Sequence, residues 1–362
     1  MPALITHRLF GEQALSDDAI SAELLRAIPD LAAAVAGGTG AQADEGADAA
    51  RSDDARDAFL IANQGPDPLF FGFTSTRAHV CHDVATRMHH EHEGAVLAAM
   101  RDAVRLLPPQ DRQVGLAFAA GQLAHYALDR TAHPFVYAQQ YELERADEQL
   151  RSAPHELHAL IESDIDSAML LRLRGVTTLD YPPARALSCS ERAARVGGEL
   201  LAQAAFEREG IDLRPADYPR CLDDMVTCYR VIEPAGGGAS RVLGALERRI
   251  RSHSELQALA HRVDAEADCP AMNPHGNPWL SPTTGELSCA RFDQLFDQAL
   301  ALFGRIVGPY LAGADVAALA EGLDYSGAPL RGTRDAGEGD DADEPERGFG
   351  GQVMDDGSEA GA

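Results

Sequence analysis

The chain has 362 residues, 45% of them hydrophobic and 24% charged, a composition that excludes a fibrous or wholly disordered protein. It carries 31 basic and 57 acidic residues, and the formal net charge of −26 disfavours binding to nucleic acids or to acidic membranes. All of the basic residues are arginine, a usage that suggests a GC-rich bacterial genome. The absence of lysine excludes Schiff-base chemistry and a Walker-type phosphate loop.

Targeting signals are not found in the sequence. The N-terminal residues show no basic region followed by an apolar stretch, and no run of eighteen apolar residues occurs, so we expect neither a signal peptide nor a transmembrane helix. The six cysteines lack C-x2-C spacing, which favours reduced thiols. Together these features predict a cytoplasmic protein.

Most of the chain shows the apolar spacing of amphipathic helices. In chain order, the expected helices are residues 19–35, 83–107, 112–130, 154–173, 190–207, 218–232, 239–263 and 289–311. Pro29 is expected to break or kink the first of them. Residues 175–179 are the one short candidate strand. The sequence therefore predicts a single all-α domain, a multi-helix bundle spanning residues 1–330.

Two segments lack this apolar spacing. Residues 37–56 are rich in glycine, alanine and aspartate, and we expect a flexible loop there. Residues 331–362 hold ten acidic and three basic residues among small ones. Such a segment buries too little apolar surface to offset its loss of conformational entropy, so we expect a disordered acidic tail.

Histidine is the most informative residue type, and ten of the thirteen lie at or before position 158. In GQLAHYALDRTAHPF, His125, Asp129 and His133 recur every fourth residue and so share one helix face. Pro134 is expected to end this helix directly after His133. The surrounding residues are apolar, and burial of His125 and Asp129 without a partner would cost several kcal/mol. A bound metal ion would supply that partner.

A second segment, PHELHALIESDID, repeats the pattern. His158, Glu162 and Asp166 lie four residues apart on one face, whereas His155 is expected at the surface. Two helices that present imidazoles and carboxylates toward one another are typical of metal sites in helical bundles. We expect Asp166, one turn beyond Glu162, to orient a metal ligand rather than bind the metal.

Three more segments carry candidate ligands. NQGPDPLFF forms a rigid turn that holds the carboxylate of Asp67 beside an apolar anchor. In RMHHEH, His89 and His92 share a helix face, with His90 between them, and which imidazole points inward stays open. His7 lies near the N-terminus. His253, His261 and His275 fall outside these segments and are assigned no role.

These segments resemble the zinc-dependent phospholipase C family, which shares its fold with zinc nucleases that cut single-stranded nucleic acids. The likeness runs from about residue 2 to residue 170 and is carried by an early histidine, by N-x-G-P-D-P-x-F-F and R-M-H-H-E-H, and by H-Y-x-L-D-x-x-x-H-P and H-x-x-x-E-x-x-x-D. It implies a helical bundle with a metal cleft that holds two or three zinc ions.

The resemblance also implies a ligand set. One zinc ion would be bound by Asp67, His89, His125 and Asp129. A second would be bound by His133, His158 and Glu162. Asp129 would bridge to a third ion held by His7 and by the N-terminus, which would be Pro2 after removal of Met1. The alternative is that Met1 stays and that only two ions bind.

The resemblance implies a zinc-dependent phosphoester hydrolase, most similar to phospholipase C, acting on a phospholipid or another small phosphodiester. Zinc lowers the pKa of a bound water to about 7 and so provides hydroxide at neutral pH. We expect Asp67 to be the catalytic residue that orients this water or accepts its proton. A zinc-dependent nuclease and a non-catalytic zinc-binding protein are the alternatives, and the negative charge disfavours the nuclease.

Overall fold

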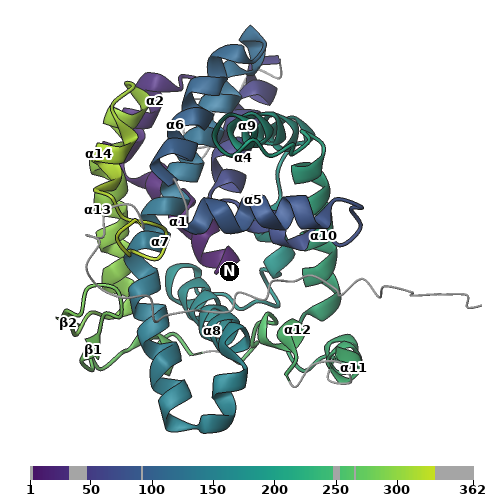
Figure 1. The fold of residues 1–362 in the computed structure, drawn as a ribbon, viewed down its shortest axis with the longest axis vertical. Coiled ribbons are helices and arrows are strands. Elements are labelled where there is room, and N and C mark those ends of the chain that lie inside the picture. The colour runs from purple at the N-terminus through teal and green to yellow at the C-terminus, as the bar shows by residue number, and fades with distance from the viewer. Residues whose placement is uncertain (1–2, 32–46, 91–92, 248–252, 265, 331–362) are drawn as a thin grey trace, which may run out of the picture.

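The computed structural model describes residues 3–31, 47–90, 93–247, 253–264 and 266–330. These residues are mostly helical, which confirms the all-α prediction (Figure 1). The longer helices are α1 (Leu4–Ser16), α2 (Asp18–Ala27), α4 (Ala47–Ala62), α5 (Ala78–His90), α6 (Glu93–Ala103), α7 (Arg112–Ala146), α8 (Pro154–Arg174), α9 (Glu191–Glu209), α10 (Asp217–Ile232), α11 (Gly238–Glu247) and α13 (Phe292–Leu311).

Short elements connect these helices. They are η2 (Asp67–Phe71), η3 (Val104–Leu106), η4 (Pro109–Asp111), η5 (Glu148–Ser152), η6 (Pro183–Leu187), α12 (Glu255–Ala258), η7 (Pro270–Met272), β1 (Trp279–Leu280), β2 (Leu287–Ser288) and α14 (Val316–Ala320). The two strands pair in antiparallel register, with Trp279 opposite Ser288 and Leu280 opposite Leu287. They are the only strands among the described residues.

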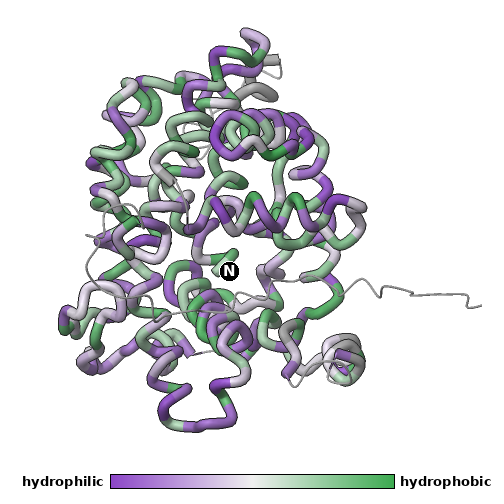
Figure 2. The backbone as a smooth tube through the Cα atoms, in the orientation of Figure 1, coloured by the Kyte–Doolittle hydropathy of each residue, from purple (hydrophilic) through white to green (hydrophobic). Residues whose placement is uncertain are grey.

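Helix α7 is the centre of the fold and packs against α4, α8, α9 and α13. Its residue Gly121 allows a close approach to α4, because a Cβ there would lie 2.3 Å from the carbonyl oxygen of Phe59. Phe10 on α1 meets Phe296 on α13 edge-to-face at 5.3 Å and extends the same core. Figure 2 shows hydrophobic and hydrophilic residues alternating along the helices, as expected for amphipathic helices around a shared core.

The prediction that Pro134 ends its helix is wrong. Helix α7 continues through Pro134 to Ala146. Proline cannot donate a hydrogen bond to the carbonyl of Arg130, four residues earlier. Gly327 lies against this position, since a Cβ on Gly327 would be 2.6 Å from the Arg130 oxygen and 3.0 Å from Pro134 Cγ. Burial of Phe135 and Val136 on the following turn supports the continued helix.

Several other predicted boundaries need correction. The expected helix 83–107 is two helices, α5 and α6, whose axes run in different directions in Figure 1. The expected helix 239–263 comprises only α11 and the short α12. Residues 175–179 do not form a strand, because Gly175, with φ of 67°, caps the C-terminus of α8.

The expected loop 37–56 is helical from Ala47 onward, as the first part of α4, and its earlier residues lie outside the described part of the chain. The tail 331–362 also lies outside it. As expected, α2 ends before Pro29. The six cysteines, all of which lie in the described residues, form no disulfide bond.

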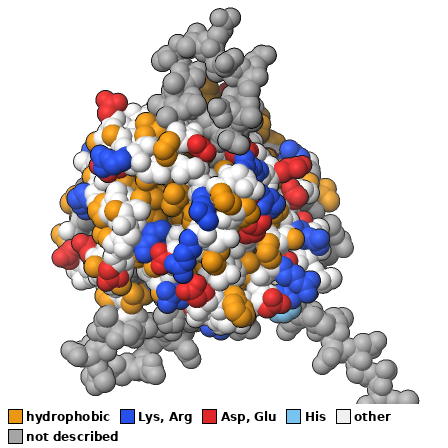
Figure 3. All heavy atoms as spheres, turned by 90° about the horizontal axis from the view of Figure 1, so that it is seen from above, with side chains coloured by type: hydrophobic (Ala, Val, Ile, Leu, Met, Phe, Trp, Pro, Cys, Tyr) orange, Lys and Arg blue, Asp and Glu red, His pale blue; other side chains and the backbone are white. Residues whose placement is uncertain are grey.

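Two surface properties bear on partners. None of the helices in the described ranges combines the length and the apolar character needed to cross a membrane. On the end of the molecule shown in Figure 3, arginine side chains lie among acidic and hydrophobic ones. This face therefore offers no continuous basic track to a polyanion.

Candidate metal centre

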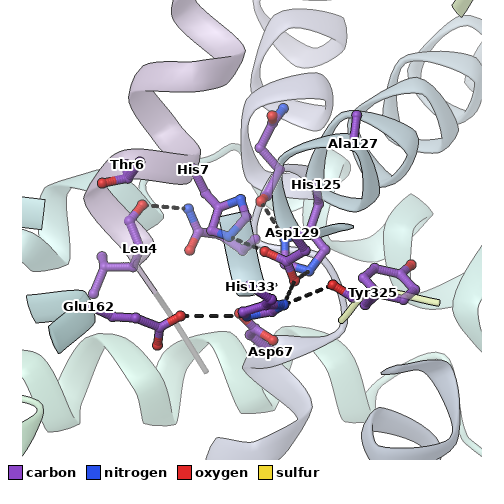
Figure 4. A network of polar contacts seen from close by, with 12 residues as sticks. Leu4, Thr6, His7, Asp67, His125, Ala127, Asp129, His133, Glu162 and Tyr325 are labelled. Carbon is purple, nitrogen blue, oxygen red and sulfur yellow. Dashed lines mark hydrogen bonds and ion pairs between the residues drawn. The ribbon is translucent and has the colours of Figure 1, made fainter. Parts of the chain in front are cut away.

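The eight predicted ligands come from five elements, α1, η2, α5, α7 and α8. Figure 4 shows how His7, Asp67, His125, Asp129, His133 and Glu162 lie close to one another. They form three groups of buried residues, each of which could hold a metal ion with ligand atoms within 4.8 Å of one another. The groups are His7, His125 and Asp129; Asp67, His89 and His125; and His133, His158 and Glu162. The structure thus brings together the eight side chains that were expected as metal ligands.

Asp129 lies at the centre of the cluster. Its Oδ1 is 3.0 Å from His7 Nε2, and its Oδ2 is 3.0 Å from His125 Nε2. His133 Nδ1 is 3.9 Å from the same Oδ2. Both oxygens of this carboxylate therefore face imidazoles.

Asp67 and His89 form one side of the cluster. Asp67 begins η2 directly after the Gly65-Pro66 turn, and its Oδ1 is 3.1 Å from His89 Nε2. His89 is 7% exposed and points inward from the last turn of α5, which settles the orientation that the sequence left open between His89 and His90. His92 lies outside the described residues.

His158 and Glu162 form the opposite side, on α8. His158 Nε2 is 3.3 Å from Glu162 Oε1, and His133 Nε2 is 3.6 Å from the same oxygen. The two imidazoles therefore converge on one carboxylate oxygen from different helices. The distance between ligand atoms about 2.1 Å from a tetrahedral ion is about 3.4 Å, so this spacing fits a shared metal ion.

Hydrogen bonds to groups outside the cluster of candidate ligands fix the orientation of four imidazoles. The Nδ1 atoms of His89, His125 and His133 lie 2.8, 3.0 and 2.8 Å from the carbonyl oxygens of Ala85, Asn63 and Tyr325. Because a carbonyl only accepts, each Nδ1 carries the proton. His158 Nδ1 is paired in the same way with Gln140 Oε1 at 3.1 Å. In a neutral imidazole, this leaves the lone pair on Nε2, which faces the cluster.

The turn before Asp67 has the conformation that His125 requires. Gly65 has φ of 58°, and a Cβ at this position would lie 2.2–2.5 Å from the His125 ring. The Gly65 carbonyl accepts a hydrogen bond from Gln122 Nε2 at 3.1 Å. Glycine is therefore needed both for the backbone and for the space of the imidazole.

The electrostatics of the cluster favour a bound cation. Although burial opposes it, the charges of His125, His133 and His7 hold the pKa of Asp129 well below its usual range. Burial lowers the pKa of His89 and His158, so both are neutral at pH 7, the form in which histidine binds metals. For His133, burial is outweighed by the charge of Asp129 and a hydrogen bond to Glu162, which raise the pKa to about 9. A metal would displace this proton.

Several buried polar atoms in the cluster have no hydrogen-bond partner within the described part of the chain. They are His7 Nδ1, His89 Nε2, His125 Nε2 and Asp67 Oδ1. Such atoms cost free energy unless something satisfies them. Imidazole nitrogens and carboxylate oxygens are the donors that zinc prefers, so the residues present fit that ion.

The space beside the cluster is small. A cavity of about 20 Å³ is lined by His7, Asp129, His133 and Glu162, together with Thr6 and Ile165. It is large enough for a water molecule or an ion, whereas sites for small ligands usually exceed about 300 Å³. This cavity by itself is therefore too small to hold a phospholipid or another phosphodiester.

Asp166, which was expected to orient a metal ligand, faces the start of α1. Its carboxylate accepts hydrogen bonds from the backbone amides of Ile5 and Thr6, the residues just before His7. Its position one turn beyond Glu162 places it beside the start of α1 rather than beside the imidazoles. His261, which was assigned no role in the sequence analysis, is buried against it. His155 and His275 are exposed.

Two residues whose oxygen atoms orient candidate ligands, Gln140 and Tyr325, were not predicted from the sequence. Gln140 follows His133 by seven residues on one helix face, and it was overlooked because the helix was expected to end at Pro134. Tyr325 comes from the far end of the chain, and no periodicity links it to the motifs. The N-terminal residues 1 and 2, including the proposed ligand Pro2, lie outside the described residues.

Comparisons of the chain with protein-family models, with curated proteins and with solved structures found no match.

Proposed function

We propose that this protein is a zinc-dependent phosphoester hydrolase similar to phospholipase C. The observation that carries the proposal is the orientation of four imidazoles whose protonated Nδ1 atoms are tied to outer acceptors and whose Nε2 atoms face three carboxylates. This arrangement is common to histidines that bind zinc. The resemblance of the motifs to phospholipase C gives the reaction class.

Bound zinc ions would supply a nucleophile at neutral pH and positive charge for the phosphoryl oxygens. His125, His133 and His158 would bind through Nε2, and Asp129 would hold two ions at a fixed separation. Asp67 is held ionised, because its contacts with His89 and His125 lower its pKa despite burial. An ionised carboxylate at this place accepts a hydrogen bond from water and so orients it toward phosphorus.

The substrate that we propose is a phospholipid or another small phosphodiester. The formal net charge of −26 repels extended polyanions, and this supports a small substrate over a nucleic acid. A non-catalytic zinc-binding protein is the second candidate, favoured by the cavity of only about 20 Å³ beside the cluster.

One experiment separates these candidates. The protein is purified without chelator, its zinc content is measured by atomic emission, and turnover of a chromogenic phosphodiester is followed with and without added zinc. We expect two or three zinc ions per chain and zinc-dependent turnover. Two or more ions without turnover would favour the non-catalytic candidate. Fewer than one ion per chain, unchanged by added zinc, would contradict the metal centre itself.

A further inference from the structure

The N-terminus of α1 is capped by a side chain from another helix. The first turn of a helix leaves backbone amides without partners, and a nearby side chain usually accepts from them. Ala3, at the capping position, offers no such side chain. Instead Asp166 on α8 accepts from the amide of Ile5 through Oδ2 at 2.9 Å and from that of Thr6 through Oδ1 at 2.7 Å.

The carboxylate of Asp166 is itself held by His261. His261 Nε2 lies 3.0 Å from Asp166 Oδ2, and His261 Nδ1 lies 2.6 Å from Glu233 Oε1. The ring is 1% exposed and Asp166 is fully buried. Although burial opposes it, these two contacts raise the pKa of His261 to about 9, so at neutral pH both nitrogens donate. The cation offsets the cost of burying the Asp166 charge.

The capped turn leads directly into a candidate metal ligand. His7 follows Thr6, and its Nε2 is 3.0 Å from Asp129 Oδ1. Thr6 and His7 from α1 and Glu162 and Ile165 from α8 line the same cavity of about 20 Å³. The Asp166 cap therefore sets the position of α1, and with it His7, relative to the ligands on α8.

We propose that Asp166, held in place by His261, is a positioning residue that keeps His7 in register with Asp129 for metal binding. This inference rests on the proposed metal centre. It assigns a function to two buried groups that bind no metal and lie outside the reacting part of the site. It also explains why a fully buried carboxylate accepts hydrogen bonds from two backbone amides of α1.

The test is a double-mutant cycle on the full chain, with zinc alone as the probe. Zinc stoichiometry and dissociation constants are measured for the wild type, Asp166→Asn, His7→Ala and the double variant. We expect Asp166→Asn to raise the dissociation constant of one zinc ion by 10–100-fold, the range for residues that orient metal ligands. In the His7→Ala background the same substitution should have no further effect on zinc binding, because Asp166 acts on the metal only by positioning His7.

A control and a second variant make the result decisive. Asp111→Asn removes another buried carboxylate, one that pairs with Arg192 and Arg195, and should leave zinc binding unchanged. His261→Gln should weaken the same zinc ion as Asp166→Asn and change the visible spectrum of the Co²⁺-substituted protein as His7→Ala does, even if Asp166→Asn does not fold. The proposal is overturned if both single variants bind zinc as the wild type does, or if their effects persist without His7. A wild type that binds no zinc would overturn the metal centre as well.

Discussion

His133 Nδ1 lies 2.8 Å from the backbone carbonyl oxygen of Tyr325, a residue 192 positions later in the chain. The Tyr325 ring packs against His89 and His125, with ring centroids 5.2 and 5.5 Å apart. The last described residues thus form a turn that packs against the candidate metal centre and orients His133. Asp324 stabilises this turn by accepting from the amides of Ser326 and Ala328.

Displacing this turn should weaken metal binding. Gly327, with φ of 69°, lies so close to α7 that a Cβ would meet Arg130 O and Pro134 Cγ. We expect Gly327→Ala to move the Tyr325 carbonyl away from His133 and to lower zinc affinity about 10-fold, measured by competition with a chromophoric chelator. Gly313→Ala is the matched control, because Gly313 also has positive φ but no neighbour within 4 Å. Equal zinc affinities in the two variants would contradict this role of the turn.

Asp129 should be the most sensitive ligand, because each of its oxygens faces a different imidazole. We expect Asp129→Ala to lose at least one zinc ion per chain and to reduce phosphodiester turnover by about 100-fold or more. Asp224→Ala removes another buried carboxylate, which binds Thr74 instead, and should retain zinc and activity. Unchanged zinc content in Asp129→Ala would show that α7 does not supply the bridging ligand.

His89 and His90 should differ sharply. His89 is buried with Nε2 3.1 Å from Asp67, whereas His90 is half-buried and its side chain leaves the helix about 100° further round. Zinc titration should show weakened binding in His89→Ala and wild-type binding in His90→Ala. The reverse ranking would mean that the orientation of α5 is wrong.

Most of the candidate ligands could be grouped from the sequence because their grouping depends on local spacing. His125, Asp129 and His133 share a face in any helix, and so do His158 and Glu162. The helix boundaries were less predictable where tertiary contacts override a local rule. Pro134 ends a helix in isolation, but in α7 the core continues past it, and this also hid Gln140. Tyr325 and His261 reach the site through long-range contacts that no sequence period encodes.

Zinc should also stabilise the fold, because the ligands come from α1, η2, α5, α7 and α8. An ion that binds only the folded state, at a free concentration a thousand times its dissociation constant, adds about 4 kcal/mol to the free energy of unfolding. We therefore expect a chelator to lower the melting temperature by several degrees in scanning calorimetry. Asp129→Ala should respond less to the chelator than the wild type. A melting curve unchanged after verified removal of zinc would place the metal outside the core of the fold.

The stabilising contribution of His261 should be lost at alkaline pH. Its hydrogen bonds to Asp166 and Glu233 raise its pKa to about 9 against burial, whereas unfolded histidine titrates at about 6.5. A group with a raised pKa in the folded state stabilises it fully below about pH 6.5, and this contribution is lost as the pH rises through about 9. The difference corresponds to about 3 kcal/mol in the free energy of unfolding.

Urea unfolding of the zinc-saturated protein between pH 6 and pH 10 measures this contribution, because metal-bound imidazoles do not titrate in that range. We expect the free energy of unfolding of the wild type to fall between pH 7 and pH 10, and that of His261→Gln to be lower at pH 7 and to fall less steeply, because burial raises the pKa of Cys189 and Cys269 in both proteins. His253→Gln, at a half-buried histidine that contacts only Ser152 among the polar groups described, should follow the wild-type curve. Parallel curves for the wild type and His261→Gln would show that His261 is neutral in the folded protein, and the charge balance inferred for Asp166 would then be wrong.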